Sequence, residues 1–417
     1  MNEAAKRIKQ NLIDFSELGI WIAMGLLIGA ITAFFEFIYQ MGLETVLKIH
    51  SELNPWILFG MPFAGLLLVV LFEKYGKKSR KGMNLVFEIS QGKERWIPKR
   101  TLSLMMFATW ISNLFGASVG REGVAMQIGT TIASFINRRF PFFYHEKTIF
   151  LVSGMAAGFA GLFGTPYTAV FFAIEVLVAG TLKYRALPCT IAASLMASWV
   201  GGLLGLNAET HILPAPLTIS SIDQGWKYLL LGIGFGIVGG SFAWISKKFR
   251  GWILKKIPDG KKRVLIVGII LAVLLFVLWN GRYSNFGTNL IDGCFYKPPM
   301  TIYPWDWLVK MLLTIGCLSV GFVGGEVTPL FAIGSSLGFV IGPLFGMDPA
   351  WSAALGYAAV FGAGTNTWLA PIMVGIEIFG FGGFPAFFIA CSAAYLVNHS
   401  QSIYALQQRY EEEKTEA

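Results

Sequence analysis

The chain has few charged residues, cysteines and histidines for its length. Only 14% of its 417 residues are Asp, Glu, Lys or Arg, below the roughly 25% usual for soluble domains, whereas 55% are hydrophobic. Its four cysteines lack the CxxC spacing of a zinc site and the density of a disulfide framework. We therefore expect no metal site and no cofactor.

Signatures of a membrane-embedded enzyme are also missing. The sequence contains no HExxH motif, no Ser/His pairing near a glycine turn and no cysteine cluster. We therefore expect a protein that is not an enzyme.

Long apolar runs take the place of charged residues. Stretches such as 228–245 and 264–279 approach the roughly 20 apolar residues that cross a hydrocarbon core, and others are shorter or broken by glycine. The sequence therefore predicts an all-α polytopic membrane protein with many short or incomplete helices. Residues 1–417 are expected to form a single transmembrane transport domain.

The basic residues gather where loops are expected. The net charge is +9, and Lys and Arg cluster within 74–100 and 247–263. An excess of these residues marks cytoplasmic loops, so the charge indicates membrane topology and no nucleic-acid partner is expected. Lys6, Arg7 and Lys9 place the N-terminus on the same side. Residues 401–417 are predicted to form a charged, cytoplasmic C-terminal helix that leaves the membrane.

Three blocks of sequence recur in the same order at nearly constant spacing. They are GMNLV at 82 and GTNLI at 287, GREGVAMQIG at 120 and GGEVTPLFAIG at 324, and residues 154–175 and 356–377. The chain is thus predicted to consist of two related halves, 14–206 and 222–400. Such repeats are typical of secondary transporters, whose ion site lies at the repeat interface, and inverted halves are the favoured arrangement.

Helix N-termini are expected inside the membrane at 83–86, 120–124 and 324–328. Each segment begins with glycine-rich backbone and continues as an apolar, helix-like run. Free N–H groups and the positive end of the helix dipole at such starts attract an anion. The alternative is close helix packing through small residues, which explains most of the 48 glycines.

Glu122 is the main candidate for function. An ionisable side chain in a lipid-embedded segment is costly and indicates a functional site. As a carboxylate it can occupy an anion site itself, and protonation then vacates that site. The alternative is a salt bridge to Arg121, which is disfavoured because adjacent side chains on a helix diverge.

Other acids and a tyrosine are secondary candidates. Glu326 aligns with Glu122 in the repeat and is predicted to act in a proton relay, or else to bond free amides at a helix start. Thr328 offers a hydroxyl to an anion or proton path. Glu175 and Glu377 end equivalent apolar runs and are interpreted as structural. The phenol of Tyr404 either reaches inward as a donor or belongs to an interfacial belt.

GREG followed by an apolar helix, GGEVTP some 200 residues later, and a tyrosine near the end together resemble the CLC family of anion channels and anion/proton antiporters. The resemblance implies an inverted-repeat, homodimeric fold with one anion pathway in each subunit. It assigns the external gate and proton acceptor to Glu122, backbone amides for the anion to Glu326 and Val327, and a hydroxyl at the central site to Tyr404.

Departures from the motifs of the chloride-handling members indicate which branch of the family the sequence resembles. Met83 stands at the serine of the GSGxP motif, Val86 at its proline, Val327 at a common aromatic position, and Val176 where chloride/proton exchangers place an inner acid. These features resemble the fluoride-exporting branch, which exchanges fluoride for protons. The alternative is a chloride/proton antiporter or passive anion channel of the same fold.

The resemblance implies a set of site residues and partners. Fluoride is strongly hydrated, so its site must supply strong donors or a protonated carboxyl. We expect Glu122 to gate and carry the proton, with Glu326 and Thr328 on an auxiliary path. Fluoride, protons, a lipid bilayer and a second copy of the chain are the expected partners, in a bacterial-type plasma membrane with both termini cytoplasmic. The expected anion-binding residues are Met83, Asn84, Gly123, Val124, Val327 and Tyr404.

Overall fold

A computed structural model describes residues 3–140, 143, 145–206, 224–295, 301–398 and 400–410, with side chains from residue 16 onward. The first series of helices is α1 (Glu3–Glu52), α2 (Met61–Leu71), α3 (Met83–Ser90), α4 (Arg100–Leu114), α5 (Glu122–Arg139), α6 (Lys147–Phe163), α7 (Pro166–Glu175) and α8 (Leu187–Leu203). The second is α9 (Gly225–Lys256), α10 (Gly260–Val277), α11 (Thr288–Phe295), α12 (Asp306–Val320), α13 (Val327–Ile341), α14 (Pro349–Thr365), α15 (Leu369–Phe379) and α16 (Phe384–Asn398). Two short strands, β1 (Val178–Ala179) and β2 (Gln408–Arg409), pair in parallel.

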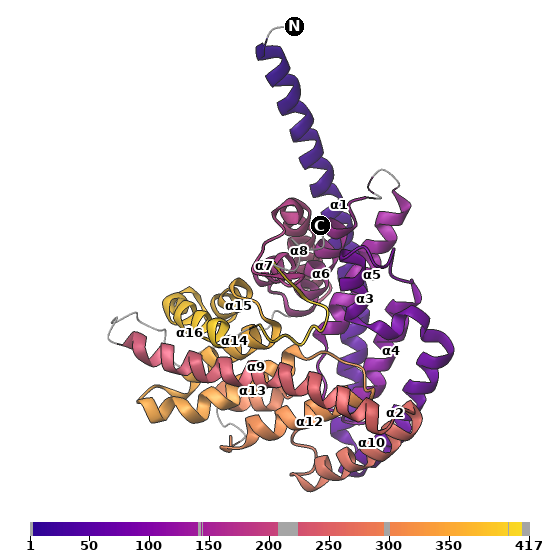
Figure 1. The fold of residues 1–417 in the computed structure, drawn as a ribbon, viewed down its shortest axis with the longest axis vertical. Coiled ribbons are helices and arrows are strands. Elements are labelled where there is room, and N and C mark those ends of the chain that lie inside the picture. Colours follow the sequence, from indigo (N-terminus) through magenta and orange to yellow (C-terminus); the bar gives the residue numbers. More distant parts are fainter. Residues whose placement is uncertain are drawn as a thin grey trace.

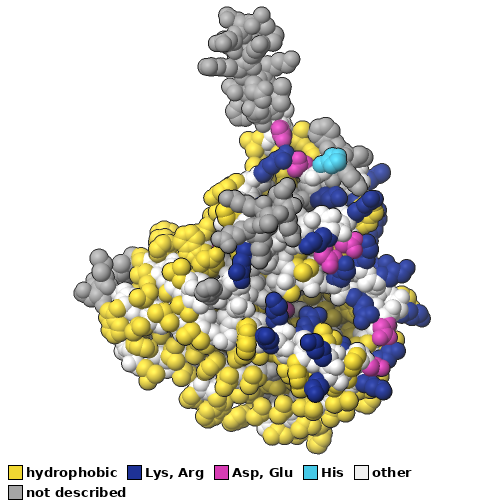
Figure 2. All heavy atoms as spheres, in the orientation of Figure 1, with side chains coloured by type: hydrophobic (Ala, Val, Ile, Leu, Met, Phe, Trp, Pro, Cys, Tyr) yellow, Lys and Arg dark blue, Asp and Glu magenta, His cyan; other side chains and the backbone are white. Residues whose placement is uncertain are grey.

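The helices confirm a membrane-embedded, all-α architecture. Six segments among the described residues are long and apolar enough to cross a bilayer: Ser16–Glu52, Pro55–Ser90, Tyr184–Leu203, Gly225–Lys256, Val327–Phe345 and Phe381–Asn398. Figure 2 shows hydrophobic side chains along the lower and left rim of the molecule, while Lys and Arg gather over the centre and right of the visible face. The chain is therefore a multi-pass membrane protein with a strongly basic face.

The order of the helices, and the lengths of several of them, repeat along the chain. α3 and α11 have 8 residues each, α4 and α12 have 15, and α6 and α14 have 17. The packing repeats as well, because α1 contacts α6 and α8 as α9 contacts α14 and α16. Figure 1 shows the second series below and to the left of the first. This correspondence supports the repeat seen in the sequence.

Equivalent positions end equivalent helices in the two halves. Gly164 follows α6 with a left-handed φ of 65°, and Asn366 follows α14 with a φ of 55°. Gly and Asn are the residues that adopt this conformation most readily. Pro166 then starts α7, where its missing N–H costs no intrahelical bond. The breaks between helices are thus determined by local sequence.

Glycines allow two helix pairs, α5 with α6 and α13 with α14, to cross in contact. A methyl group on Gly129 would overlap the carbonyl oxygen of Gly154, and one on Gly334 would overlap the carbonyl oxygen of Gly356. These pairs are equivalent in the two halves. Close packing through small residues, the alternative considered for the glycines, is therefore present here, away from the helix starts.

The described residues 401–409 do not belong to the predicted C-terminal helix. α16 ends at Asn398, and the following segment consists of turns and β2 up to Arg409, after which Tyr410 is helical. Its backbone bonds to distant partners, since Ile403 N donates to Gly364 O at 2.9 Å and Gln407 Nε2 donates to Val176 O at 2.9 Å. These tertiary bonds replace the i→i−4 bonds of a helix. Residues 411–417 of the predicted helix lie outside the described residues.

Candidate functional site

Two helices begin face to face at the centre of the site. Gly120 N donates to Gly325 O at 2.6 Å, and Gly325 N donates to Gly120 O at 2.9 Å, which forms an isolated antiparallel bridge. α5 starts two residues after Gly120, and α13 starts two residues after Gly325. Because these are equivalent segments of the repeat, their antiparallel pairing is the local symmetry expected of inverted halves. Two positive helix ends thus lie side by side.

The carboxylate of Glu122 sits at the N-terminus of the opposite helix. Its Oε2 accepts hydrogen bonds from Thr328 N at 3.0 Å and from Arg121 N at 3.2 Å, and its Oε1 accepts one from Thr328 Oγ1. The side chain is fully buried. Free amides at a helix N-terminus form an anion site, so the carboxylate occupies a place that suits a small anion.

Glycine is required on both sides of this carboxylate. A Cβ on Gly120 would lie 2.7 Å from Glu122 Oε2, and one on Gly325 would lie 3.0 Å from the same oxygen. Real Cβ atoms do not approach so closely without a shift of the neighbour. The two glycines of the bridge therefore leave room for the acid between the helix starts.

A salt bridge between Arg121 and Glu122, the alternative considered for this acid, is present at long distance. Arg121 Nε lies 3.9 Å from Glu122 Oε1, at the outer limit of an ion pair. The guanidinium packs between the rings of Phe163 and Phe286, at 5.5 and 5.3 Å, and donates to Gln40 Oε1 at 3.1 Å. The amides of Thr328 and Arg121 lie closer to this carboxylate than the guanidinium Nε does.

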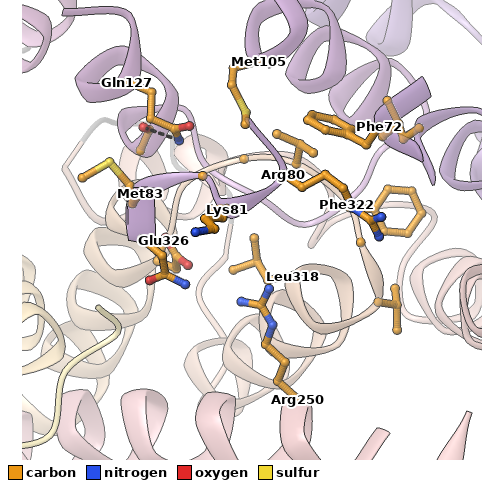
Figure 3. Close-up of a pocket in the computed structure, with 18 of the residues that line it drawn as sticks. Phe72, Arg80, Lys81, Met83, Met105, Gln127, Arg250, Leu318, Phe322 and Glu326 are labelled. Carbon is orange, nitrogen blue, oxygen red and sulfur yellow. Dashed lines mark hydrogen bonds between the residues drawn. The ribbon is translucent and has the colours of Figure 1, made fainter. Parts of the chain in front are cut away.

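A cavity of about 290 Å³ leads to this pair of helix starts. Figure 3 shows Met83, Gln127 and Glu326 on one side of it, with Arg250 reaching in from α9. Five of the predicted site residues line it: Met83, Asn84, Gly123, Glu326 and Tyr404. The cavity therefore collects candidates from three helix starts and the C-terminal segment.

The remaining predicted residues are buried beside the cavity. Val124, Val327 and Thr328 are fully or almost fully buried in the first turns of α5 and α13. Thr328 contacts Glu122 through polar groups, whereas the two valines present apolar side chains. Val124 and Val327 thus contribute backbone position and apolar walls in this structure.

Helix α3 adds a third start at the cavity. It begins at Met83, directly after Gly82, whose φ of 56° belongs to the left-handed region. The amides of Met83 and Asn84 are in the first turn, where N–H groups have no intrahelical acceptor. The helix starts predicted from the sequence are confirmed at all three positions.

Tyr404 reaches the site from a turn and not from a helix. Its side chain is 5% exposed, and its ring packs 5.4 Å from Phe87 and 6.5 Å from Phe172. Because the residue also lines the cavity, the inward orientation holds and the interfacial-belt alternative is wrong.

Glu326 does not act as a helix cap. It stands at the N-cap position of α13, yet among the described residues its side chain makes no capping hydrogen bond. It lines the cavity, where Arg250 interacts with it electrostatically. The carboxylate also interacts with its own backbone amide, so contact with a free amide and a place on the cavity lining occur together.

Basic side chains line the same cavity and were interpreted from the sequence only as loop residues. Arg250 and Arg263 come from α9 and α10, and Lys81 forms ion pairs with Glu88 at 2.6 Å and Glu94 at 3.3 Å. These cations outnumber Glu326, the acid on the same lining, and a cleft with an excess of one charge concentrates ions of the opposite charge. The cationic residues on the lining are Arg80, Lys81, Arg250 and Arg263.

Glu175 and Glu377 confirm the structural interpretation, in a form the sequence did not suggest. Glu175, at the end of α7, accepts hydrogen bonds from the amides of Trp368, Leu369 and Ala370 at 2.5–3.2 Å. Glu377, on α15, accepts them from Tyr167 N, Thr168 N and Thr168 Oγ1 at 2.6–3.1 Å. Each acid therefore caps the helix that carries the other.

Replacement of Glu377 by alanine is expected to destabilise the fold by about 1–3 kcal/mol, because it strips a charged acceptor from the start of α7. Thermal unfolding of the purified protein in detergent measures the loss. Glu44→Ala, at an exposed site on α1, is the matched control and is expected to unfold like the parent. A Glu377→Ala protein with parental stability and altered ion selectivity would contradict the capping role.

Two buried charged residues were missed at the sequence level. Lys310 on α12 is fully buried and donates to Ser118 Oγ, Tyr283 O and Asn285 O at 2.7–3.1 Å. Glu36 on α1 is also fully buried. Each is a single ionisable residue within an apolar run of the sequence. Such a pattern indicates a functional site and would have identified both residues.

Comparisons with known proteins agree with this geometry. A 33% identical relative, a chloride/fluoride channel protein of Pseudomonas syringae pv. tomato, aligns over 93% of this chain and 86% of its own length. An H(+)/Cl(-) exchange transporter ClcA of Vibrio campbellii is 24% identical over 63% of this chain and 58% of its own.

Solved structures give the same fold. The crystal structure of a CLC-type fluoride/proton antiporter matches with a TM-score of 0.91 and 43% identity, over 95% of this chain and 99% of that one. A slow cyanobacterial Cl-/H+ antiporter, 19% identical, matches in fold with a TM-score of 0.81 over 95% of this chain and 98% of its own. The voltage gated chloride channel family matches residues 64–399. The chain therefore belongs to the voltage gated chloride channel, or CLC, family.

Proposed function

We propose that the protein exports fluoride in exchange for protons. The observation that carries this proposal is the Glu122 carboxylate, which is buried at the start of α13 and hydrogen-bonded by Thr328 and a backbone amide. The 43% identical CLC-type fluoride/proton antiporter and the chloride/fluoride channel protein support fluoride as the anion. Both align over almost the whole chain.

The exchange follows from competition for one position. The ionised Glu122 carboxylate occupies the position beside the free amides at the start of α13. An anion therefore binds at this position only when the carboxylate has taken up a proton and moved away. When the anion leaves, the acid releases its proton and returns. Proton uptake and anion binding are thereby linked, since each favours the same state.

The cavity residues are proposed to form the cytoplasmic path of the anion. Arg250 and the other basic side chains draw anions from solution, and the first-turn amides of α3 and α5, at Met83, Asn84 and Gly123, accept them. Tyr404 provides a hydroxyl on the same lining. Val124 and Val327 complete the predicted set as apolar walls.

Glu326 and Thr328 are proposed to form the auxiliary proton path. Thr328 bonds Glu122 through both its amide and its hydroxyl, and Glu326 lies two residues earlier on the cavity lining. A hydroxyl both donates and accepts, so it can pass a proton between carboxyl groups. In protonated form Glu326 also supplies a strong donor to a hydrated anion.

We propose a homodimer in a bacterial-type plasma membrane, with one anion path in each subunit and both termini cytoplasmic. We assign the basic face in Figure 2 to the cytoplasmic side of the membrane, because Lys and Arg are enriched on that side of membrane proteins. The dimer follows from family membership. Light scattering of the protein in lipid nanodiscs tests it, and a monomer mass would refute it.

Flux from proteoliposomes tests the function. Vesicles loaded with fluoride or chloride are diluted into anion-free buffer while an ion-selective electrode follows the anion and a pH electrode the proton. We expect fluoride efflux with stoichiometric proton uptake and much slower chloride efflux. Equal fluoride and chloride turnover would favour a chloride/proton antiporter, and anion flux without protons would favour a passive channel.

A further inference from the structure

The segment that follows α16 brings Tyr404 to the cavity without a helix to position it. Ile403, Tyr404 and Ala405 line the cavity, and they lie in a turn. A turn lacks the i→i−4 hydrogen bonds that fix side chains along a helix, so the place of the phenol depends on other contacts of the segment. Gln407 N donates to Tyr404 O at 3.0 Å, so the two residues belong to one turn.

The side-chain amide of Gln407 is hydrogen-bonded through both its nitrogen and its oxygen. Its Nε2 donates to Val176 O at 2.9 Å and to Thr365 O at 3.1 Å, and its Oε1 accepts a hydrogen bond from Asn366 Nδ2 at 3.3 Å. Val176 follows α7 in the first half of the chain, whereas Thr365 ends α14 in the second half. One amide group thus joins the turn of Tyr404 to both halves of the repeat.

A second glutamine joins the same segment to α3. Gln91, which follows α3 at its C-terminal end, donates from Nε2 to Leu406 O at 2.7 Å. Phe87, one turn earlier, packs its ring 5.4 Å from the ring of Tyr404. The first residue of this helix, Met83, lines the cavity. The contacts of α3 with the segment therefore place the phenol relative to the amides at the start of the same helix.

We propose that Gln407, assisted by Gln91, is a positioning residue for anion binding that acts through Tyr404. This inference rests on the proposed function, in which the Tyr404 hydroxyl belongs to the anion path. The Gln407 amide bonds to backbone oxygens outside its own segment, so it sets the place of the phenol relative to the rest of the site. A hydrogen bond weakens steeply with poor geometry, and a donor that is not held in place binds an anion less tightly.

Gln407→Leu removes the bonds of the amide and keeps a side chain of similar size. We expect the fluoride concentration for half-maximal efflux to rise roughly fivefold, because the phenol is present but displaced. Tyr404→Phe removes the hydroxyl itself and is expected to raise this concentration about tenfold. The double variant is expected to match Tyr404→Phe, since Gln407 then has no hydroxyl to position. Independent effects would instead multiply to roughly fiftyfold.

The test measures efflux from proteoliposomes against fluoride concentration for the parent, both single variants and the double variant. Calorimetry of fluoride binding supplies a readout independent of transport. Gln401→Leu is the matched control, because Gln401 lies in the same segment and bonds to Asn398 through its backbone atoms. This control is expected to keep the parental half-saturation. Partial unfolding alone would lower the maximal rate and leave half-saturation unchanged.

Gln91→Leu loosens the same segment from the side of α3 and replaces Gln407→Leu in the comparison if that variant does not fold. It is expected to raise half-saturation roughly threefold, again without a further effect in Tyr404→Phe. Unchanged half-saturation, a rise that multiplies with that of Tyr404→Phe, or a rise that Tyr404→Phe does not share would overturn the inference. A parent whose fluoride efflux takes up no protons would refute the proposed exchange, while the comparison of affinities would still decide the role of Gln407.

Discussion

Glu122→Gln is expected to abolish proton coupling and to lower fluoride efflux by roughly 10²-fold. Glutamine fills the same space and still accepts hydrogen bonds from Thr328, but it cannot alternate between a charged and a neutral form. The position at the start of α13 is then no longer vacated by a proton. Anion and proton electrodes recording from the same vesicles measure both effects.

Two controls separate this effect from damage to the protein. Glu326→Gln changes an acid on the cavity lining and is expected to slow transport less, because it leaves the carboxylate at α13 in place. Glu377→Gln changes an acid that caps a helix and is expected to preserve coupling. Proton-coupled fluoride transport at the parental rate by Glu122→Gln would contradict the mechanism.

Gly129→Ala is expected to produce the largest loss of folded protein. The added methyl would overlap Gly154 O and lie 2.9 Å from Gly158 N, so α5 and α6 must separate. Overpacking of a tight contact costs about 1–3 kcal/mol or more, and separation of these helices also moves Glu122 at the start of α5. Reduced yield of monodisperse protein and a lower unfolding temperature measure the effect.

The chain offers a matched control for this substitution. Gly234 lies in α9, and a Cβ added there has no atom within 4 Å. Gly234→Ala is expected to be neutral or slightly stabilising, because alanine favours a helix more than glycine does. Gly334→Ala, at the equivalent contact of the second half, is expected to resemble Gly129→Ala. Parental stability of both Gly129→Ala and Gly334→Ala would show that the crossings relax without cost.

Much of the site could be predicted because its helix starts depend on residues that are neighbours in the sequence. Glycine-rich breaks before apolar runs placed helix starts at Met83, Glu122 and Val327, and all three are confirmed. The repeat also indicated that Glu122 and the segment around Glu326 are equivalent, and the bridge between Gly120 and Gly325 joins these segments. Local backbone preference decided these features.

Features that depend on long-range contacts were not predictable in the same way. The segment with Tyr404 has the composition of a helix, but its bonds to Gly364 and Val176 hold it in turns. Glu175 and Glu377 share a sequence position within the repeat, yet nothing in either half indicates that each caps the helix of the other.

Fluoride binding to purified protein, measured by calorimetry in two buffers of different ionisation enthalpy, tests the central claim most directly. If the anion and the Glu122 carboxylate compete for one position, fluoride binding takes up about one proton per anion, and the heat differs between buffers accordingly. Glu122→Gln is predicted to take up none. A binding heat of the parent that is independent of the buffer would contradict the claim that proton and anion share this position.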